Sequence, residues 1–259
     1  MKKNMEEKTV GAAAAEMVMD AAEIKTTTEA AGTGITVESI EEQYRKAVDA
    51  YNHLEEREKI AAVRDVFRKL GDYKQAKAYM QRCEHFLEFQ VGGTVVFGNY
   101  KGKPLKWEVL AKEGRKFLLL SEDVIDHIPF HFERSEATWS NCSLRTWLNR
   151  QFMEEAFTLQ ERMSILLIHH QNNIDPRWDN NNGKDTKDKA FVFNLKELNE
   201  YLPNRKDRAI GDWWWLRGHG CSNTNQQAVY GDGTVYADGI GSHHDEVGVR
   251  AAMWVNVRY

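Results

Sequence analysis

Three consecutive tryptophans, in the segment GDWWWLRGHG at residues 211–220, constrain the fold of this chain more than any other feature. The segment is too short to cross a bilayer as a helix, which needs about 20 apolar residues. In a strand, side chains alternate between the two faces of the sheet, so Trp213 and Trp215 would share one face and Trp214 would lie on the other. We therefore predict a central strand covered on both faces, and a well-braced position for whatever follows Arg217.

The composition limits the classes of protein to which the chain can belong. With 259 residues, of which 42% are hydrophobic and 11% aromatic, it can form one full-sized domain and a smaller one. A net charge of −4, from 35 basic and 39 acidic residues, argues against nucleic acid as the main partner. The three cysteines lack the spacing of a metal site and indicate reduced thiols.

The same survey predicts several absences. We expect no cofactor and no bound metal. We also expect no membrane span, because no segment approaches the apolar length that a spanning helix needs. Acidic residues interrupt the apolar stretch that follows MKKN, so we expect no signal peptide and a cytoplasmic location.

The N-terminal part of the chain changes character at residue 39. Residues 1–38 are rich in Ala, Glu, Lys and Thr and contain no aromatic residue, so we predict that they are disordered. Residues 39–89 show the helical period, with a break between helices at Gly71-Asp72. The segment FRKLGDYKQAKAY, 67–79, resembles the turn of tetratricopeptide-like helical hairpins. The unit is either a helical spacer or an element for peptide binding or self-association.

From residue 90 to the C-terminus, the pattern predicts a second domain that begins with β-strands. Three short β-rich runs with glycine-containing turns between them predict an antiparallel meander. The predicted strands are 94–98, 105–110 and 116–121. The later elements predicted by the same criteria are a helix over 143–152 with Cys142 or Ser143 near its N-cap, a helix over 159–163, a polar loop at 171–189, a strand at 190–193 and a helix at 195–201.

After Arg217 the chain becomes polar. The 32 residues before Arg250 contain no Lys or Arg, whereas the frequency of these residues in the whole chain predicts about four. Within this stretch AVYGDGTVY, 228–236, is typical of a hairpin with a Gly-Asp-Gly turn, its valines facing inward and Tyr230 and Tyr236 outward. The small polar residues serve either glycine-rich turns or a recognition surface.

Several segments, taken in order, resemble a bacterial family of uncharacterised domains. They are VGGTVVFGNY (91–100), LKWEVL (105–110), FLLLSEDVID (117–126), TWSNCSLRTWLN (138–149), AFVFNLKE (190–197), GDWWWLRGHG (211–220) and GVRAAMWV (248–255). That family is marked by a WWLR strand, a glycine-punctuated variable stretch and a closing GVR strand. The resemblance implies an α+β domain at 90–259, a formylglycine-generating-enzyme-like variant of the C-type lectin fold. The chain departs from the family pattern at Gly218-His219 and at Ala251. These departures affect only the expected geometry of the local turns.

The resemblance also implies a function. Members of this family are among the variable proteins of diversity-generating retroelements, which mutate the adenines of a template on copying. An AAC codon changed at its adenines can encode small polar residues and Tyr, but not Lys. The resemblance therefore implies a variable ligand-binding region at 218–247, expected to bind a protein. The positions implied to vary are His219, Ser222, Asn223, Thr224, Asn225, Tyr230, Asp232, Tyr236, Asp238, Ser242, His243, His244 and Asp245.

Such a surface suits recognition, because Tyr gives rigid contact area while Ser, Asn and Gly give adaptable hydrogen bonds. We expect Tyr230 and Tyr236 to be contact anchors. We expect Arg217 and Arg250 to brace the framework through hydrogen bonds to loop carbonyls. The framework positions expected to hold this surface rigid are Trp213, Trp214, Trp215, Arg217, Gly248, Arg250 and Trp254.

Other functions fit the sequence less well. Sulfatase-modifying oxidases of the related fold use two copper-binding cysteines, whereas only Cys221 lies in the matching region of this chain. We therefore expect that the chain is not an enzyme. The adjacent pairs His169-His170 and His243-His244 cannot both chelate a metal from one helix face, and a small site at His243, His244 and Asp245 is the weaker alternative. Trp178-Asp179-Asn180 has the wrong order for a lectin calcium site. The alternatives left open are an enzyme of that superfamily with altered chemistry and a structural module that docks through its helices at 38–89.

Overall fold

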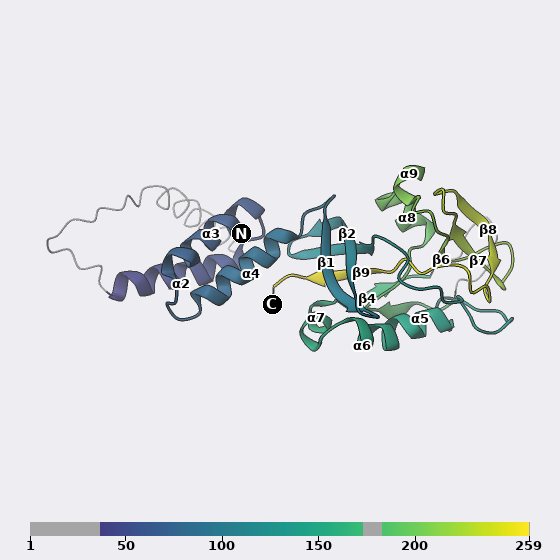
Figure 1. The fold of residues 1–259 in the computed structure, drawn as a ribbon, viewed down its shortest axis with the longest axis horizontal. Helices are drawn as coiled ribbons and strands as arrows, with labels where there is room; N and C mark the ends of the chain where they lie inside the picture. The colour runs from purple at the N-terminus through teal and green to yellow at the C-terminus, as the bar shows by residue number, and fades with distance from the viewer. Residues whose placement is uncertain (1–36, 173–182, 259) are drawn as a thin grey trace, which may run out of the picture. The chain divides into compact units, whose positions relative to one another are not determined.

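The computed structural model describes residues 37–172 and 183–258 (Figure 1). It separates into a helical unit that ends at Glu88 and a second unit that begins at Phe89. The predicted disordered segment 1–38 lies, up to residue 36, outside the described residues. None of the described helices combines the length and the apolar composition that crossing a membrane requires.

The helical unit consists of α2 (Val37–His53), α3 (Arg57–Leu70) and α4 (Ala76–Glu88). On α3, the predicted apolar stripe is buried at Ile60, Val63 and Phe67. The ring of Phe67 stacks on that of Tyr79 from α4, with 5.0 Å between centroids. The predicted break is confirmed, because α3 ends at Gly71, whose positive φ of 58° a residue with a side chain rarely adopts.

The second unit is built on a four-stranded antiparallel sheet. Its strands lie in the order β1-β2-β3-β9, and bulges in β1 and β2 curl it. The predicted meander is therefore confirmed, and the C-terminal strand completes the sheet by pairing Trp254 with Leu118. The strands are β1 (Thr94–Tyr100), β2 (Lys103–Glu113), β3 (Lys116–Ser121) and β9 (Ala252–Asn256).

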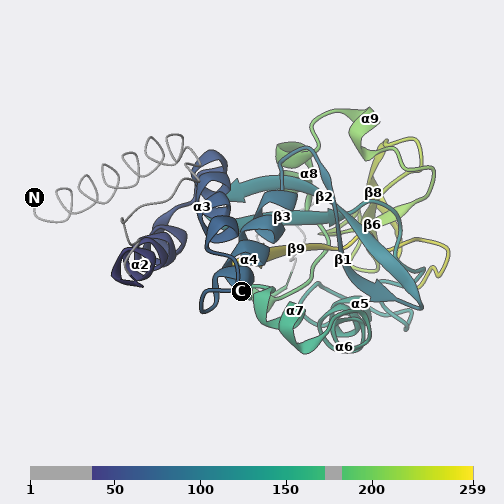
Figure 2. The ribbon, with the colours of Figure 1, turned by 60° about the vertical axis from the view of Figure 1, so that its left-hand side comes forward.

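Short helices lie beside β1 (Figure 2). The predicted helix over 143–152 is present with Cys142 as its N-cap, but its second half is π-helical and the helical segment continues to Ala156. Aromatic contacts hold it to the sheet, since the ring of Phe152 lies 5.5 Å from that of Tyr100. The helices are α5 (Ser143–Trp147), the π-helix η1 (Leu148–Phe152), α6 (Met153–Ala156) and α7 (Leu159–Ser164), the last matching the prediction at 159–163.

The tryptophan segment does not form a central strand, so this prediction needs correction. The three-stranded sheet has the order β6-β7-β8, which places β6 (Trp214–His219) at its end, followed by β7 (Asn225–Val229) and β8 (Val235–Gly241). The other edge of β6 is covered by the backbone of Gly248, which accepts a hydrogen bond from Trp215 at 3.0 Å. Trp214 and Trp215 are fully buried, but Trp213 precedes the strand and is 40% exposed.

Two further predictions are corrected between residues 165 and 210. The predicted loop at 171–189 contains β5 (Thr186–Asp188), which pairs with β4 (Ile168–His170) just before the loop. The buried positions of both strands are polar and give no apolar alternation. The predicted strand at 190–193 is buried but forms only one bridge, from Phe191 to Ala252. Helix α8 (Leu195–Tyr201) matches the prediction, and α9 (Arg205–Arg208) was not predicted. Together the helices and antiparallel sheets give an α+β architecture.

Candidate functional site

Three aromatic rings form a continuous stack at the surface of the β6–β8 sheet. The ring of Trp213 meets that of Tyr230 edge to face with 4.3 Å between centroids, and Tyr230 stacks on Tyr236 at 5.2 Å. Tyr230 and Tyr236 are half-buried, and partial burial raises the pKa of the Tyr230 hydroxyl. Both tyrosines were predicted to be exposed and are half-buried, and Trp213, which was predicted to belong to the framework, lies in this surface stack.

The predicted hairpin is also confirmed, with Val229 paired to Val235 and Ala228 to Tyr236. The hydroxyl-bearing tyrosines occupy its outer side, while Val229 is fully buried. At the turn, the Asp232 carboxylate accepts a hydrogen bond from the backbone N–H of Thr234 at 2.8 Å. It also forms an ion pair with Arg205 of α9. These contacts lower the pKa of the Asp232 carboxyl, the bond from Thr234 most of all.

The other polar positions divide by burial. Those that are exposed are Thr224, Asp232, Asp238 and Asp245, and those that are half-buried are Ser222, Asn223, Asn225, His243 and His244. Two positions are corrected: His219 is 1% exposed and Ser242 is fully buried. The Nδ1 of His219 lies 3.0 Å from the amide nitrogen of Gln226, inside the unit. The sequence gives no sign of this burial, because both residues are polar and lie among turn residues.

The two adjacent histidines form a small cluster at the other end of β8. The rings of His243 and His244 lie 4.8 Å apart, and the Nδ1 of His244 is 2.8 Å from a Glu246 oxygen. Partial burial and the charge of Arg134 lower the pKa of His243. Within the described ranges, no three His, Cys, Asp or Glu side chains are grouped as a metal site requires. The segment Trp178-Asp179-Asn180 lies outside the described residues.

Arg217 braces the buried side of β6. Its guanidinium donates to the carbonyl of Val192 at 2.8 Å and makes a bidentate pair with the carboxylate of Glu197, 2.7 Å away at one contact. Glu197 in turn accepts from the backbone N–H of Asn194, in the capping box that begins α8. The predicted bond to a carbonyl is confirmed; the carboxylate partner was missed, because no spacing in the sequence relates Glu197 to Arg217.

Arg250 has the same role on the four-stranded sheet. It is fully buried, donates to the carbonyl of Ser121 at 2.7 Å and to Glu108 at 2.5 Å, and lies 5.3 Å from the ring centre of Trp214. Burial raises the pKa of Glu108 and lowers that of Arg250, although the two charges attract each other. The predicted bond to a carbonyl is present, but Ser121 is the last residue of β3 and not part of a loop.

Gly248 and Trp254 are two further framework positions. At Gly248 a Cβ atom would be 2.5 Å from Val124 and 2.9 Å from the carbonyl oxygen of Trp213, so only glycine allows this approach. Trp254 is half-buried on β9 and pairs with Leu118. The tip of the unit, which we define as residues 218–247, therefore rests on buried tryptophan and arginine side chains.

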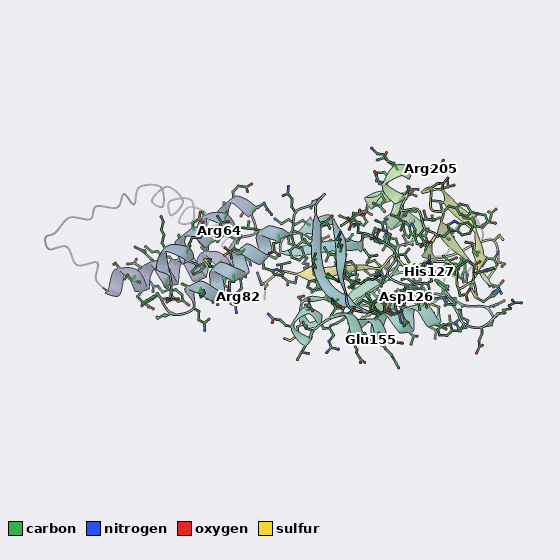
Figure 3. The ribbon with its side chains drawn as sticks, viewed as in Figure 1. Arg64, Arg82, Asp126, His127, Glu155 and Arg205 are labelled. Carbon is green, nitrogen blue, oxygen red and sulfur yellow. The ribbon has the colours of Figure 1, made fainter. Side chains whose placement is uncertain are left out.

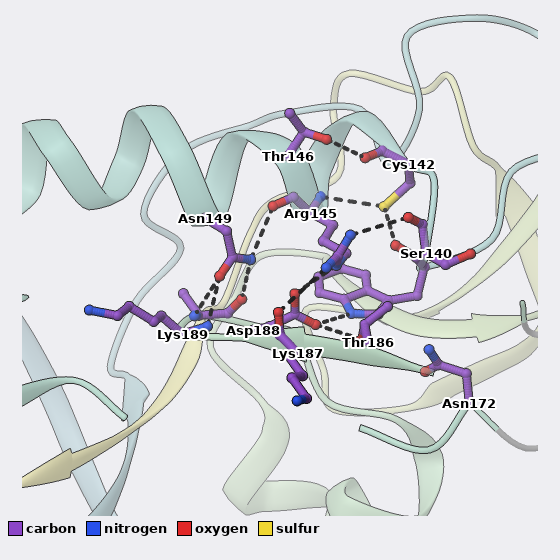
Figure 4. Close-up of polar contacts among 12 residues, drawn as sticks. Ser140, Cys142, Arg145, Thr146, Asn149, Asn172, Thr186, Lys187, Asp188 and Lys189 are labelled. Carbon is purple, nitrogen blue, oxygen red and sulfur yellow. Dashed lines mark hydrogen bonds and ion pairs between the residues drawn. The ribbon is translucent and has the colours of Figure 1, made fainter. Parts of the chain in front are cut away.

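A buried carboxylate that sequence reasoning missed fastens α5 to β5 (Figure 4). Asp188 is fully buried and accepts hydrogen bonds from Trp139 at 2.9 Å, Arg145 at 2.6 Å and Thr186 at 2.7 Å. Three side chains of the protein donate to this carboxylate, which indicates a structural role for the cluster. Nearby, the buried thiol of Cys142 has its pKa raised to about 12 by burial, which keeps it protonated at neutral pH.

A second pair missed by sequence reasoning lies at the base of the aromatic stack. The Nε2 of His127 is 3.0 Å from a carboxylate oxygen of Asp212, whose other oxygen accepts from the backbone N–H of Trp213 at 2.7 Å. Figure 3 labels His127 beside Asp126, which binds Lys101 at 2.7 Å. Residues 127 and 212 are 85 positions apart, so only the fold brings them together.

Comparison with known proteins gives one family. A family-wide sequence profile described as "Domain of unknown function (DUF6273)" matches residues 114–257. No curated protein and no solved structure matches the chain. The matched segment includes β3, the helices α5–α9, the tip and β9. Since it covers more than half of the 259 residues, the chain belongs to the DUF6273 family.

Proposed function

We propose that the chain is a ligand-binding protein that displays a diversified polar and aromatic surface at its tip. Its partner would be a protein, and the second unit would be a formylglycine-generating-enzyme-like C-type lectin domain whose tip is varied by a retroelement. In this proposal the chain is not an enzyme. The helical unit, tetratricopeptide-like in its α3–α4 turn, would serve as a spacer or a site of self-association.

The observation that carries the proposal is the separation of exposed tip side chains from the buried frame. Eleven of the thirteen positions implied to vary are exposed or half-buried. Behind them, Trp214, Trp215 and Arg250 are fully buried and Arg217 is 4% exposed. Because surface substitutions away from such features change stability by about 0.5 kcal/mol or less, the tip side chains can differ while the frame keeps its shape.

The topology supports the proposed lectin-type fold in one respect. Strands β3 and β9 are neighbours in the sheet although the whole segment from α5 to β8 separates them in the chain. That segment ends in the tip, so the closing strand returns the chain to the sheet after the proposed binding surface. Such an arrangement holds both ends of the variable stretch at fixed positions.

The proposal is tested by changing the tip and measuring stability and binding separately. In the full chain, Asn223, Thr224, Asp238 and Asp245 are replaced together by other small polar residues, and thermal unfolding is followed by tryptophan fluorescence. We expect the melting temperature to stay within a few degrees and affinity for a selected protein ligand to change. A collapse of thermal stability would show that these side chains hold the fold together.

Two further readouts separate the alternatives. A nearby non-coding copy of the DNA encoding 211–255, differing at adenines alone and lying beside a reverse transcriptase, would support diversification. An intact genomic neighbourhood without such a copy would remove the retroelement part of the proposal. A catalytic rate on a small substrate that stays constant across the tip variants would favour the enzyme alternative.

A further inference from the structure

The aromatic stack leaves large apolar rings in water at the centre of the proposed binding surface. Trp213 is 40% exposed, while its neighbours in the chain, Trp214 and Trp215, are fully buried. Tyr230 and Tyr236, which are half-buried, continue this aromatic area along the hairpin. Tryptophan and tyrosine are the residues most enriched at the energetic centres of interfaces, and three in contact form a single anchor-sized area.

The stack is held rigidly before any ligand arrives. The backbone N–H of Trp213 donates to Asp212 at 2.7 Å, and its carbonyl accepts from Gly248 at 2.8 Å. The backbone N–H of Tyr230 donates to the carbonyl of Thr234 at 2.8 Å across the hairpin turn. Since the backbone positions and ring contacts are fixed, binding would lose little conformational entropy.

The charges around the stack are negative. No Lys or Arg occurs between residues 218 and 249. Asp238 is exposed two residues after Tyr236, where a bulge interrupts the pairing of β8 with β7. Asp212 precedes Trp213 directly and pairs with His127 at 3.0 Å. Asp232, by contrast, is already balanced by Arg205.

These two properties together define a ligand chemistry. The face of an aromatic ring attracts a cation, and nearby carboxylates add to that attraction. The protein itself makes such contacts elsewhere: Arg250 lies over Trp214 at 5.3 Å and Lys101 over Tyr100 at 5.2 Å. A neutral or acidic ligand would gain the ring contacts but would meet the carboxylates without compensation.

We propose that the stack of Trp213, Tyr230 and Tyr236, with the carboxylate of Asp238, binds an arginine or lysine side chain in a basic segment of a protein partner. This inference rests on the proposed function and deepens it, since it states which chemistry the tip recognises. The stack provides the cation–π contact, and Asp238 pairs with the charge at its edge. Trp213 lies outside the tip residues and supplies an anchor that does not depend on variation within 218–247.

The test uses three synthetic peptides of equal length, in each of which one test residue alternates with glycine. Each peptide is titrated into the full chain by calorimetry. One contains arginine, one contains citrulline, which has nearly the shape of arginine without its charge, and one contains glutamate. We expect the arginine peptide to bind more tightly than the citrulline peptide and the glutamate peptide not to bind. Raising the salt concentration should weaken the arginine complex, because exposed charges are screened.

Matched variants locate the site. Tyr236→Leu and Trp213→Leu remove ring faces and should each weaken arginine-peptide binding by roughly fivefold to tenfold, whereas Trp213→Phe should retain most of it. Phe132→Leu alters another exposed aromatic residue, 65% exposed, and should have no effect. Asp238→Asn should weaken binding and its salt dependence, while Glu155→Gln on α6, which lies apart from β8 in Figures 1, 2 and 3, should not.

Three results would overturn the inference. Equal binding of the arginine and citrulline peptides would show that charge is not recognised. Unchanged binding by folded Tyr236→Leu and Trp213→Leu, with folding verified by near-ultraviolet circular dichroism, would show that the rings are not the anchor. Equal losses in Asp238→Asn and Glu155→Gln would show attraction by net charge alone. Each of these leaves the melting and genomic tests of the proposed function unaffected, so the two can fail independently.

Discussion

His170 should make the second unit lose stability in acid. Its side chain is 4% exposed, and its ring lies 4.2 Å from that of Phe191. The Nε2 atom is buried without a hydrogen-bond partner in the part of the chain that the structure describes. Burial and the charge of Arg217 lower the pKa of His170 to about 3. Glu197, 3.8 Å away, would favour the charged ring but is already engaged by Arg217.

The sign of the effect follows from linkage. The folded-state pKa lies below the unfolded value of about 6.5, so between the two values the unfolded chain binds a proton that the folded chain does not. Stability contributed by the neutral ring is complete above pH 6.5 and is lost as the pH falls. At pH 5, which is about 1.5 units below the unfolded pKa, the loss is about 2 kcal/mol. For a unit of this size, that lowers the melting temperature by roughly 4–8 °C.

The assay is urea unfolding between pH 7.5 and about 4.5, followed by tryptophan fluorescence. Other groups also titrate in this range, so the measured quantity is the difference between the wild type and His170→Phe, which keeps a ring against Phe191 and cannot be protonated. We expect His170→Phe to lose less stability on acidification. His169→Gln is the matched control, because its side chain is 51% exposed. Parallel stability curves for the wild type and His170→Phe would refute the reasoning.

Three other predictions follow from the same structure and are measured by urea unfolding at pH 7. Asp188→Ala should cost about 3–5 kcal/mol, because Arg145 keeps a partly buried charge without its partner; a loss below 1 kcal/mol would mean that solvent compensates. Gly248→Ala should cost about 1–3 kcal/mol, because the added methyl group must displace packed neighbours, and an unchanged midpoint would contradict the close approach. Asp238→Tyr should change stability by less than about 0.5 kcal/mol, whereas Ser242→Tyr should cost about 1–3 kcal/mol or prevent folding. Equal effects at these two positions would contradict their different burial.

The elements that the sequence predicts well are those with a strong local signal. The apolar stripes of α3, the meander of β1–β3 and the Gly-Asp-Gly hairpin all follow from periodicity or turn chemistry. The position of the tryptophan segment within its sheet is harder to predict. Alternation predicts which side chains share a face of the sheet, but not whether a partner strand lies along each edge. A single parallel bridge from Trp214 to Gly248 takes the place of that strand.

The elements that the sequence does not predict depend on contacts between distant residues. The sequence predicts that Asp188 lies in a loop, whereas in the folded chain it accepts hydrogen bonds from Trp139, Arg145 and Thr186. Glu197 likewise has a local role as a capping residue and a distant one as the partner of Arg217. Both carboxylates belong to polar residues in polar surroundings, so no periodicity marks Asp188 as buried or Glu197 as half-buried.

Burial also limits how far the proposed variable surface can extend. The N–H of Ser242 donates to the carbonyl of Thr224, and its carbonyl accepts from the N–H of His131, each at 2.8 Å. These backbone bonds tolerate any side chain, but the surrounding atoms leave no exposed path for a larger one, since Ser242 is fully buried. Random change at this codon would therefore produce mostly destabilised proteins. A serine codon of the TCN type has no adenine at the two positions that determine the residue, so under the retroelement proposal it is the type expected at Ser242. Codons with adenines at those positions are expected at exposed residues such as Asp238.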